Sequence, residues 1–200
     1  MSNDLKQKTG IVILAAGNSS RLGQPKQLLE YKDSTLLNNT IKEAILVPDS
    51  TIIVVTGSNT EIIENDLNFA QIKTCFNSEW ESGIATSIAK GLKELLTLCP
   101  DCESCIFAVC DQPYLTSTVF MDLIQHYQNN EKGIIASTYS EILGTPVLFS
   151  EKYFDELLEL EGHEGAKKII NRFIDDVIAV PFEKGNVDID TIEDYDKLIS

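Results

Sequence analysis

A turn rich in glycine and serine, with two cationic side chains, follows an apolar run near the start of the chain. The run spans Ile11 to Leu14 and has the character of a strand buried on both faces. Backbone amides at a glycine turn can form a concavity that binds anions. Arg21 and Lys26 add the positive charge that a triphosphate requires. The turn therefore predicts phosphate binding, and an ordinary strand-to-helix connection is the alternative.

Two widespread phosphate-binding loops do not match this turn. A P-loop has four residues between its glycines and ends in Gly-Lys-Ser/Thr. Here five residues separate Gly17 from Gly23, and Gln24 comes next. The dinucleotide fingerprint Gly-x-Gly-x-x-Gly is also excluded, because Asn18 and Ser19 follow Gly17. If the turn binds phosphate, it belongs to another class of phosphate-binding site.

The remaining pattern, from Leu14 to Lys26, is Leu-Ala-Ala-Gly-x-Ser-x-Arg-x-Gly-x-x-Lys. It resembles the nucleotidyltransferases that release pyrophosphate, and within them most the molybdenum cofactor cytidylyltransferase branch. The resemblance implies catalytic roles for Arg21, Lys26 and Asp111. It also implies that the nucleotide is bound by Leu14, Ala15, Ala16, Gly17, Ser19, Ser20, Gly23, Lys26, Asn77, Gly83 and Ser87.

Carboxylates near two predicted element boundaries could hold a divalent cation. Asp111 directly follows an apolar strand, and Mg²⁺ binds through one or two carboxylates plus substrate phosphates. A turn-forming aspartate is the alternative at this position. The resemblance implies that Asp190 completes the Mg²⁺ site, with Asp188 as the alternate ligand. The competing interpretation is that Asp190 or Thr191 caps the last helix.

The segment from Asn77 to Ile88 resembles the family element Asn-x-x-Trp-x-x-Gly-x-x-x-Ser. A helix that starts at Gly83 would offer free amides to a base, a ribose or a phosphate. The alternative is a plain helix start that Ser82 caps and Trp80 anchors.

The acceptor side is the part of the resemblance that departs from the family pattern. The segment from Gly162 to Lys167 resembles Gly-Asp-x-Gly-Ala-Arg, but His163 replaces the usual aspartate and Lys167 the usual arginine. The acceptor is therefore the least constrained part of the assignment. The residues implied on this side are Gln112, Pro113, Gly144, Pro146 and His163.

The composition excludes several classes of partner. A formal net charge of −15 repels nucleic acid and anionic membranes, so we expect neither as a partner. No apolar run approaches the length of a membrane span, and the polar start lacks a signal-peptide core. We therefore expect a cytoplasmic protein with residues 1–8 flexible.

Cysteine usage agrees with a reducing compartment. Five cysteines are an odd number without a secretory context, which favours free thiols over disulfides. Cys99, Cys102 and Cys105 have a spacing that can hold zinc or an iron–sulfur cluster. The usual cluster motif, however, ends in a cysteine followed by proline, whereas Asp111 follows Cys110. We favour reduced thiols and keep a metal site as the alternative.

Strand and helix patterns alternate along the chain, which is typical of a parallel sheet with helices on both faces. We expect strands at 11–14, 51–56, 72–75, 105–110, 134–137, 146–149 and 177–180. We expect helices at 36–45, 61–67, 84–95, 119–127, 154–160, 166–173 and 192–199. The predicted fold class is α/β: a single three-layer α/β/α Rossmann-like domain over residues 1–200. Its sheet is mostly parallel, with residues 146–149 as an antiparallel edge strand. Ligands bind such sheets at the carboxyl ends of the strands, where the Gly17 turn and Asp111 both lie.

Taken together, the motifs predict transfer of a nucleotidyl group to a phosphate-bearing acceptor, with release of pyrophosphate. Ala16 matches the cytidylyltransferase form of the motif, where guanylyltransferase relatives have glycine, which favours CTP. The resemblance implies Mg²⁺ as cofactor, molybdopterin as acceptor and a molybdoenzyme as a candidate client. Two alternatives stay open. One is a sugar-phosphate or isoprenoid-precursor nucleotidyltransferase, and the other is a non-catalytic chaperone that holds a molybdenum cofactor.

Overall fold

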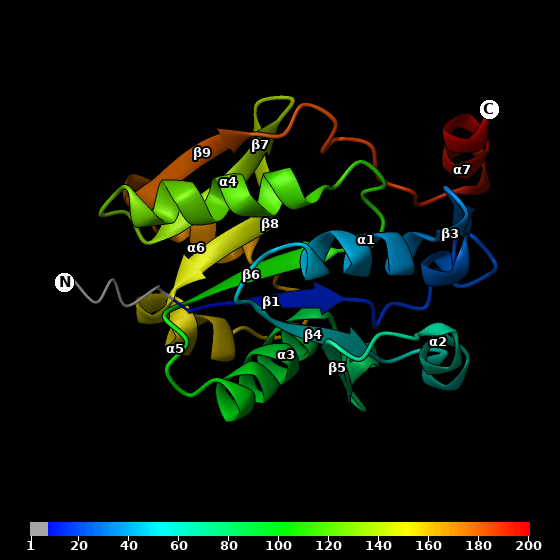
Figure 1. The fold of residues 1–200 in the computed structure, drawn as a ribbon, viewed down its shortest axis with the longest axis horizontal. Helices are drawn as coiled ribbons and strands as arrows, with labels where there is room; N and C mark the ends of the chain where they lie inside the picture. The colour runs from blue at the N-terminus through cyan, green and yellow to red at the C-terminus, as the bar shows by residue number, and fades with distance from the viewer. Residues whose placement is uncertain (1–7) are drawn as a thin grey trace.

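A seven-stranded sheet runs through the centre of the molecule in the computed structural model, which describes residues 8–200 (Figure 1). The strand order is β5-β4-β1-β6-β8-β7-β9. The strands are β1 (Thr9–Leu14), β4 (Thr51–Thr56), β5 (Ile72–Phe76), β6 (Ser104–Val109), β7 (Ile134–Tyr139), β8 (Ile142–Ser150) and β9 (Val177–Pro181). The expected flexibility of residues 1–8 concerns residues that lie, apart from Lys8, outside the described part of the chain.

The sheet is mostly parallel, as predicted. β1 pairs in parallel with β4 and β6, and β7 pairs in parallel with β9. β8 runs antiparallel to both of its neighbours, β6 and β7. The antiparallel strand is thus confirmed, but its predicted place at the sheet edge is wrong, since the edges are β5 and β9.

The reason for this difference is the local geometry around Pro146. Proline cannot donate a ladder hydrogen bond and therefore favours sheet edges or bulges. In β8 the pairing with β7 shifts register between Val147 and Gly144, so Pro146 falls in an irregular stretch. The pairing with β6 ends at Val147. A bulge, and not an edge, accommodates the proline.

Helices cover both faces of the sheet, which confirms the three-layer architecture. They are α1 (Leu36–Ile45), α2 (Thr60–Asp66), α3 (Ile84–Leu98), α4 (Ser117–Gln128), α5 (Phe154–Leu158), α6 (Lys167–Arg172) and α7 (Ile192–Ile199). Alternate side chains of β1 point to opposite layers, as strand geometry requires. Val12 joins the apolar cluster under α3, α5 and α6, whereas Ile11 and Ile13 join the cluster under α1, α2 and α4. In Figure 1, α1 and α4 lie in front of the sheet.

The last helix, α7, lies beyond the sheet, next to the short hairpin of β2 (Glu30–Tyr31) and β3 (Ser34–Thr35) (Figure 1). Ile189 is fully buried there with Leu22, Leu29 and Leu36. This small cluster ties the chain before α7 to the segment that follows the glycine turn. The C-terminal segment is thereby held at the end of the sheet where the parallel strands finish.

The hairpin gave no recognisable sequence signal. Its turn residues, Lys32 and Asp33, both have positive φ, at 50° and 59°. Two-residue hairpin turns of this kind are usually marked by Asn-Gly or Asp-Gly, and Lys-Asp carries no such mark.

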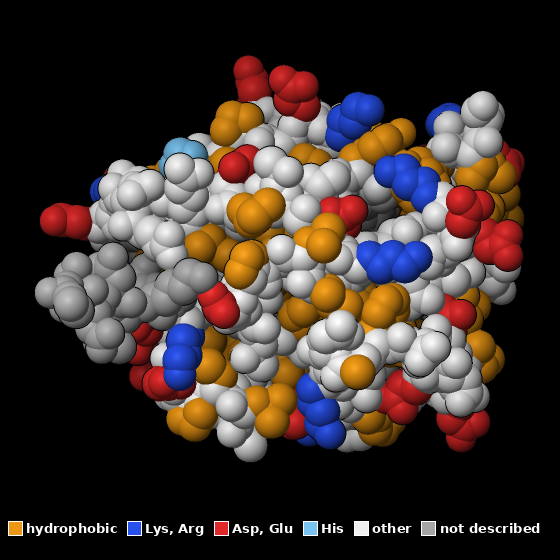
Figure 2. All heavy atoms as spheres, viewed as in Figure 1, with side chains coloured by type: hydrophobic (Ala, Val, Ile, Leu, Met, Phe, Trp, Pro, Cys, Tyr) orange, Lys and Arg blue, Asp and Glu red, His pale blue; other side chains and the backbone are white. Residues whose placement is uncertain are grey.

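Among the described residues, no helix combines the length and apolar character needed to cross a membrane. On the face drawn in Figure 2, Lys and Arg side chains are more frequent toward the end where the parallel strands finish, with acidic side chains among them.

Candidate active site

Strand pairing brings the glycine turn and Asp111 to the same edge of the sheet. β1 and β6 are parallel neighbours, and Leu14, the last residue of β1, is paired with Val109, the last residue of β6. The turn that follows Leu14 and the loop that follows Val109 therefore leave the sheet side by side. The predicted crevice at the carboxyl ends of the strands has this origin.

A cavity of about 420 Å³ lies at this position. It is bounded by the turn after β1, the start of α3, the end of β6 and the loop before α6. Its lining residues are Leu14, Ala16, Gly17, Asn18, Lys26, Gln27, Trp80, Glu81, Gly83, Ile84, Ser87, Val109, Cys110, Asp111 and His163.

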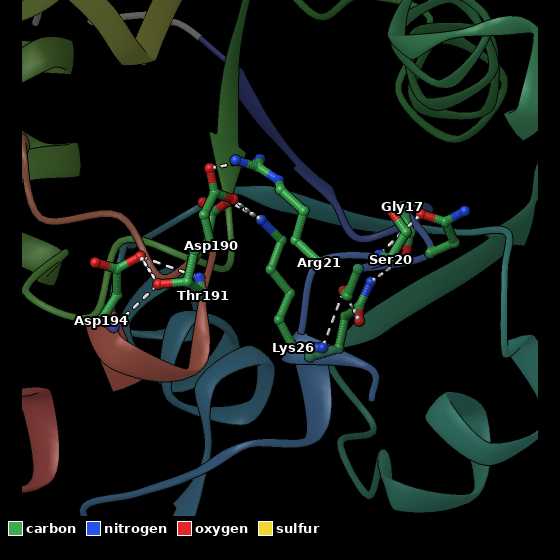
Figure 3. Close-up of polar contacts among 11 residues, drawn as sticks. Gly17, Ser20, Arg21, Lys26, Asp190, Thr191 and Asp194 are labelled. Atoms are coloured by element: carbon green, nitrogen blue, oxygen red, sulfur yellow. Dashed lines mark hydrogen bonds and ion pairs between the residues drawn. The ribbon is translucent and has the colours of Figure 1, made fainter. Parts of the chain in front are cut away.

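A cluster of opposite charges lies beside the cavity (Figure 3). The Nζ of Lys26 contacts a carboxylate oxygen of Asp111 and lies 3.0 Å from Oδ1 of Asp190. Arg21 reaches the other carboxylate oxygen of Asp190 at 2.8 Å. Lys26 and Asp111 are mostly buried, with side-chain exposures of 18% and 17%, whereas Arg21 is 69% exposed. Residues predicted to bind phosphate and residues predicted to bind metal are in direct contact here.

The charges in this cluster shift the pKa values of its members. Burial alone would lower the pKa of Lys26, but attraction to Asp111 outweighs it and the pKa lies above its ordinary value. Burial alone would raise the pKa of Asp190, but the hydrogen bonds and charges of Lys26 and Arg21 hold it below its ordinary value. Among residues 8–200, no Lys or Arg side chain forms an ion pair with Asp188. Burial, with the negative charges of Asp111 and Asp190, raises its pKa to about 6.

The carboxylates suit a hard divalent cation. Oδ1 of Asp111 is buried and has no hydrogen-bond partner in the described structure, so one oxygen ligand is left unused. Burial is the main cause of the raised pKa of Asp188, and the negative charges of Asp111 and Asp190 add to it. No group of three or more His, Cys, Asp or Glu side chains arranged for a metal occurs in residues 8–200. A cation bound by these residues would therefore need further oxygens, as Mg²⁺ does when it takes them from phosphates.

The geometry at the last helix shows which residue caps it, as the alternative interpretation of this segment expected for Asp190 or Thr191. Thr191 is the N-cap of α7, and its hydroxyl accepts a hydrogen bond from the amide of Asp194 at 3.2 Å. Asp194 completes a capping box, because its carboxylate accepts from the amide of Thr191 at 3.0 Å (Figure 3). The cap is therefore Thr191, and the carboxylate of Asp190 points to Lys26 and Arg21 instead.

The start of α3 is closed by the loop before α6. Gly83, and not Ser82, is the N-cap residue, and its φ of +114° suits glycine. A Cβ at Gly83 would stand 2.1 Å from the carbonyl oxygen of Gly162. That carbonyl also accepts a hydrogen bond from the amide of Ala85 at 3.2 Å. One amide at the helix start is thus already hydrogen-bonded. The same contact places His163, the residue after Gly162, at the cavity wall.

The structure brings only part of the predicted nucleotide set to the cavity wall. Leu14, Ala16, Gly17, Lys26, Gly83 and Ser87 line it, whereas Ala15, Ser19, Ser20, Gly23 and Asn77 do not. Asn77 instead links the end of β5 to the first turn of α3, because its side-chain amide donates to the hydroxyls of Thr86 and Ser87, both at 2.9 Å. The hydroxyl of Ser19 is also engaged internally, since it accepts from the amide of Lys26 at 3.0 Å.

Of the predicted acceptor residues, only His163 lines the cavity, and two others, Gln112 and Gly144, contact Tyr139. Nε2 of Gln112 lies 3.5 Å from the Tyr139 hydroxyl and donates to the carbonyl of Gly185 at 2.8 Å. A Cβ at Gly144 would overlap the Tyr139 hydroxyl at 2.2 Å. Burial raises the pKa of Tyr139, and Asp188 and Asp111 add to the shift. Pro113 is buried beside Gln112, and the carbonyl of Pro146 accepts from Ser137 at 2.8 Å.

Sequence reasoning missed Tyr139 and several lining residues. Asn18, Gln27, Ile84 and Cys110 line the cavity but belong to no assigned set. Gln27 carried no clear signal in the sequence, because its burial, at 1% exposure, is visible only in the structure.

The five cysteines are free and buried. Burial raises the pKa of the Cys102 thiol and of the Cys110 thiol to about 12 each. Such thiols stay protonated near neutral pH and are poor nucleophiles. Cys99 and Cys102 belong to the apolar cluster under α3, and Cys102 donates to the carbonyl of Ser104 at 3.2 Å.

The model of the MobA-like NTP transferase domain matches residues 11–177. The chain belongs to this family. The matched region contains the glycine turn, Asp111 and the loop before α6, which together form most of the cavity wall. The charged cluster described above therefore lies in a MobA-like nucleotidyltransferase with a mostly parallel sheet.

Two relatives of this MobA-like chain have names that indicate different activities. The molybdenum cofactor cytidylyltransferase of Escherichia coli (strain K12) is 28% identical over 187 residues, covering 92% of each chain. The nicotine blue oxidoreductase of Paenarthrobacter nicotinovorans is 27% identical over 209 residues, covering 98% of each.

Among solved structures, Rv0371c from Mycobacterium tuberculosis H37Rv superposes with a TM-score of 0.84 at 28% identity, covering 97% of this chain and 98% of that one. A structure of Rv0371c in complex with manganese has a TM-score of 0.77 at 25% identity, covering 96% and 97%. The fold and the family agree with the resemblance that the sequence motifs indicated.

Proposed function

We propose that this MobA-like nucleotidyltransferase transfers a cytidylyl group from CTP to a phosphate-bearing pterin acceptor, and that it works as a single domain in the cytoplasm. The observation that carries the proposal is the contact of Lys26 with both Asp111 and Asp190 at the wall of a cavity of about 420 Å³. Phosphate-binding and cation-binding groups within one cluster suit a nucleoside triphosphate that arrives with a divalent cation. The similarity to the cytidylyltransferase of Escherichia coli supports the choice of reaction.

The proposed reaction is an in-line displacement at the α-phosphorus of CTP. An oxygen of the acceptor phosphate forms the new P–O bond, and the bond to the β-phosphate breaks as pyrophosphate leaves. A phosphate acceptor is already ionised near neutral pH, so the reaction needs no general base. Lys26 and Arg21 would neutralise the triphosphate and the leaving pyrophosphate, because positioning and charge stabilisation dominate phosphoryl transfer.

Asp111 and Asp190 are the residues we propose as Mg²⁺ ligands, with Asp188 as the alternate. Mg²⁺ would neutralise charge on the phosphate oxygens and help to align them. The buried, unpartnered oxygen of Asp111 supports this assignment. The complex of the relative Rv0371c with manganese also supports a divalent cation in this family.

The choice of CTP rests on Ala16, which lines the cavity and is 5% exposed. Gly57 lies next to it, because a Cβ added at Gly57 would stand only 2.8 Å from the Ala16 Cβ. A methyl group in this place would disfavour the larger purine ring.

Ligand-induced thermal stabilisation with CTP, GTP, ATP and UTP, each with and without Mg²⁺, tests the proposal. A ligand at a hundred times its Kd stabilises a protein by about 2.7 kcal/mol, which raises Tm by a few degrees. We expect Mg²⁺-dependent stabilisation by CTP above the other nucleotides. Stabilisation by none of the four would contradict a nucleotidyltransferase and favour a protein that only holds a molybdenum cofactor.

Pyrophosphate release with a panel of acceptors then identifies the second substrate. We expect release with molybdopterin and not with sugar phosphates or isoprenoid precursors. Release with either of those instead would assign the chain to the corresponding branch of nucleotidyltransferases.

A further inference from the structure

The side chain of Gln27 lies inside the glycine turn and is only 1% exposed. Its Nε2 donates two hydrogen bonds, to the carbonyl of Ala15 at 2.8 Å and to the carbonyl of Gly17 at 2.9 Å. Both amide hydrogens of the carboxamide are thereby used. The oxygen of the same carboxamide accepts from the hydroxyl of Ser19 at 3.5 Å. One buried side chain thus contacts three residues of the turn.

These contacts set the direction of two peptide groups. In a planar trans peptide, the carbonyl of one residue and the amide of the next point in opposite directions. Because the carbonyls of Ala15 and Gly17 point to Gln27, the amides of Ala16 and Asn18 point away from it. Ala16 and Asn18 both line the cavity, and no hydrogen bond described for residues 8–200 uses either amide.

The rest of the turn depends on the same side chain. The hydroxyl of Ser19, which donates to Gln27, accepts from the backbone amide of Lys26 at 3.0 Å. Ser19 itself has a φ of 53°, a left-handed conformation that few non-glycine residues adopt without local support. Gln27 therefore helps to fix the point of the backbone from which the Lys26 side chain extends to Asp111 and Asp190.

We propose that Gln27 is a positioning residue for phosphate binding. Its carboxamide holds two carbonyl dipoles away from the triphosphate and leaves the amides of Ala16 and Asn18 to face it. Anion binding at a turn requires N–H groups, because a carbonyl oxygen at the same place repels phosphate. The inference rests on the proposed function, since it assigns the phosphate part of that site.

The test compares the wild-type protein with Gln27→Met, which keeps the length of the side chain and removes its donors. The matched control is Thr40→Val. Thr40 is 4% exposed and donates to a carbonyl of its own helix, that of Leu36 at 3.1 Å, and to none in the turn. Both variants lose buried hydrogen bonds to backbone carbonyls, so both lower Tm. Calorimetric titration of each protein uses two probes, CTP with Mg²⁺ and inorganic pyrophosphate with Mg²⁺.

We expect Gln27→Met to raise the Kd for both probes by at least about tenfold, because displaced catalytic or binding groups lose large factors. Thr40→Val should leave both Kd values unchanged. The inference is overturned if Gln27→Met binds both probes with wild-type affinity, or if Thr40→Val weakens binding equally. A wild-type protein that binds no nucleotide would instead overturn the proposed function.

Gln27→Asn provides a second variant in case Gln27→Met does not fold. It keeps a buried carboxamide but is one methylene shorter, so it can hold at most one of the two carbonyls. We expect an intermediate increase of both Kd values, and wild-type affinity in Gln27→Asn would count against the proposal.

Discussion

Lys26 and Asp190 stand 164 positions apart in the sequence, and their side chains form a 3.0 Å ion pair beside the cavity. The same ammonium group contacts Asp111, and Arg21 contacts the same Asp190. In the structure, the cations that we propose for phosphate binding neutralise the carboxylates that we propose as metal ligands. A bound nucleotide would offer negatively charged phosphates to Lys26 and Arg21. The divalent cation that comes with it would offer positive charge to Asp111 and Asp190. The cluster is thereby matched in charge to such a pair of ligands.

Replacement of Lys26 tests the centre of this cluster. Lys26→Met should reduce pyrophosphate release from CTP to background, because the phosphates lose their mostly buried cation. The apoprotein should lose about 1 to 3 kcal/mol of unfolding free energy, since Asp111 and Asp190 lose a partner. This loss is below the usual stability of a domain, about 5–15 kcal/mol, so the variant should stay folded. Lys93→Met, at an exposed position of α3, is the control and should keep full activity. Near-normal turnover in Lys26→Met would refute the mechanism.

Two carboxylate variants distinguish the proposed metal ligands. Asp190→Asn should raise the Mg²⁺ concentration that gives half-maximal activity by about tenfold or more, since a neutral amide is a weaker ligand. Asp188→Asn should change this half-maximal Mg²⁺ concentration much less. Titration of activity with Mg²⁺ at saturating CTP provides the comparison. A larger effect from Asp188→Asn would exchange the roles of the two residues.

Most of the sheet could be predicted because its strands are short apolar runs between recognisable turns. Ile11 to Leu14 and Thr51 to Thr56 were expected as strands, and β1 and β4 contain them. The place of β8 could not be predicted. Residues 146–149 were expected at the sheet edge, and only the three-dimensional pairing reveals the bulge that lets Pro146 lie inside the sheet.

In the site, too, features formed by one continuous stretch of sequence could be predicted, whereas contacts between distant segments could not. The turn from Leu14 to Lys26 could be assigned because its residue types and spacing form one continuous motif. Tyr139 could not be found, because its contacts with Gln112, Gly144 and Gly185 join segments far apart in the chain. Gln27 was overlooked because its role depends on burial inside the turn.

Two alanine-to-glycine variants test the selection of the base. Ala16→Gly should raise the affinity for GTP relative to CTP by about tenfold, since one methyl group in a pocket is worth that order of discrimination. Ala15→Gly is the matched control. Ala15 is equally buried in the turn but belongs to the opposite apolar cluster and does not line the cavity. Competition between the two nucleotides measures the ratio. An equal shift in both variants would mean that loop flexibility, and not the methyl group, sets the preference.

Asp176 should make the stability of the fold dependent on pH outside the active site. Its Oδ2 accepts hydrogen bonds from the Tyr153 hydroxyl at 2.6 Å and the Gly133 amide at 3.0 Å, and Lys152 lies 2.8 Å away. Burial alone would raise the pKa of Asp176, but these partners hold it below its ordinary value. A carboxyl group with a lowered pKa in the folded state stabilises the protein above its unfolded pKa. This stabilisation is lost as the pH falls through the folded pKa.

Asp176→Asn should therefore lower the unfolding free energy by about 1.5–3 kcal/mol at neutral pH, the usual contribution of hydrogen bonds to a charged group. The difference from wild type should narrow as the pH falls below about 4, where an ordinary aspartate becomes protonated. Urea unfolding at several pH values measures both quantities. Asp175→Asn, at the exposed neighbouring position, should show neither effect. A difference that stays constant or widens on acidification would mean that Asp176 acts through its shape, and not through its charge.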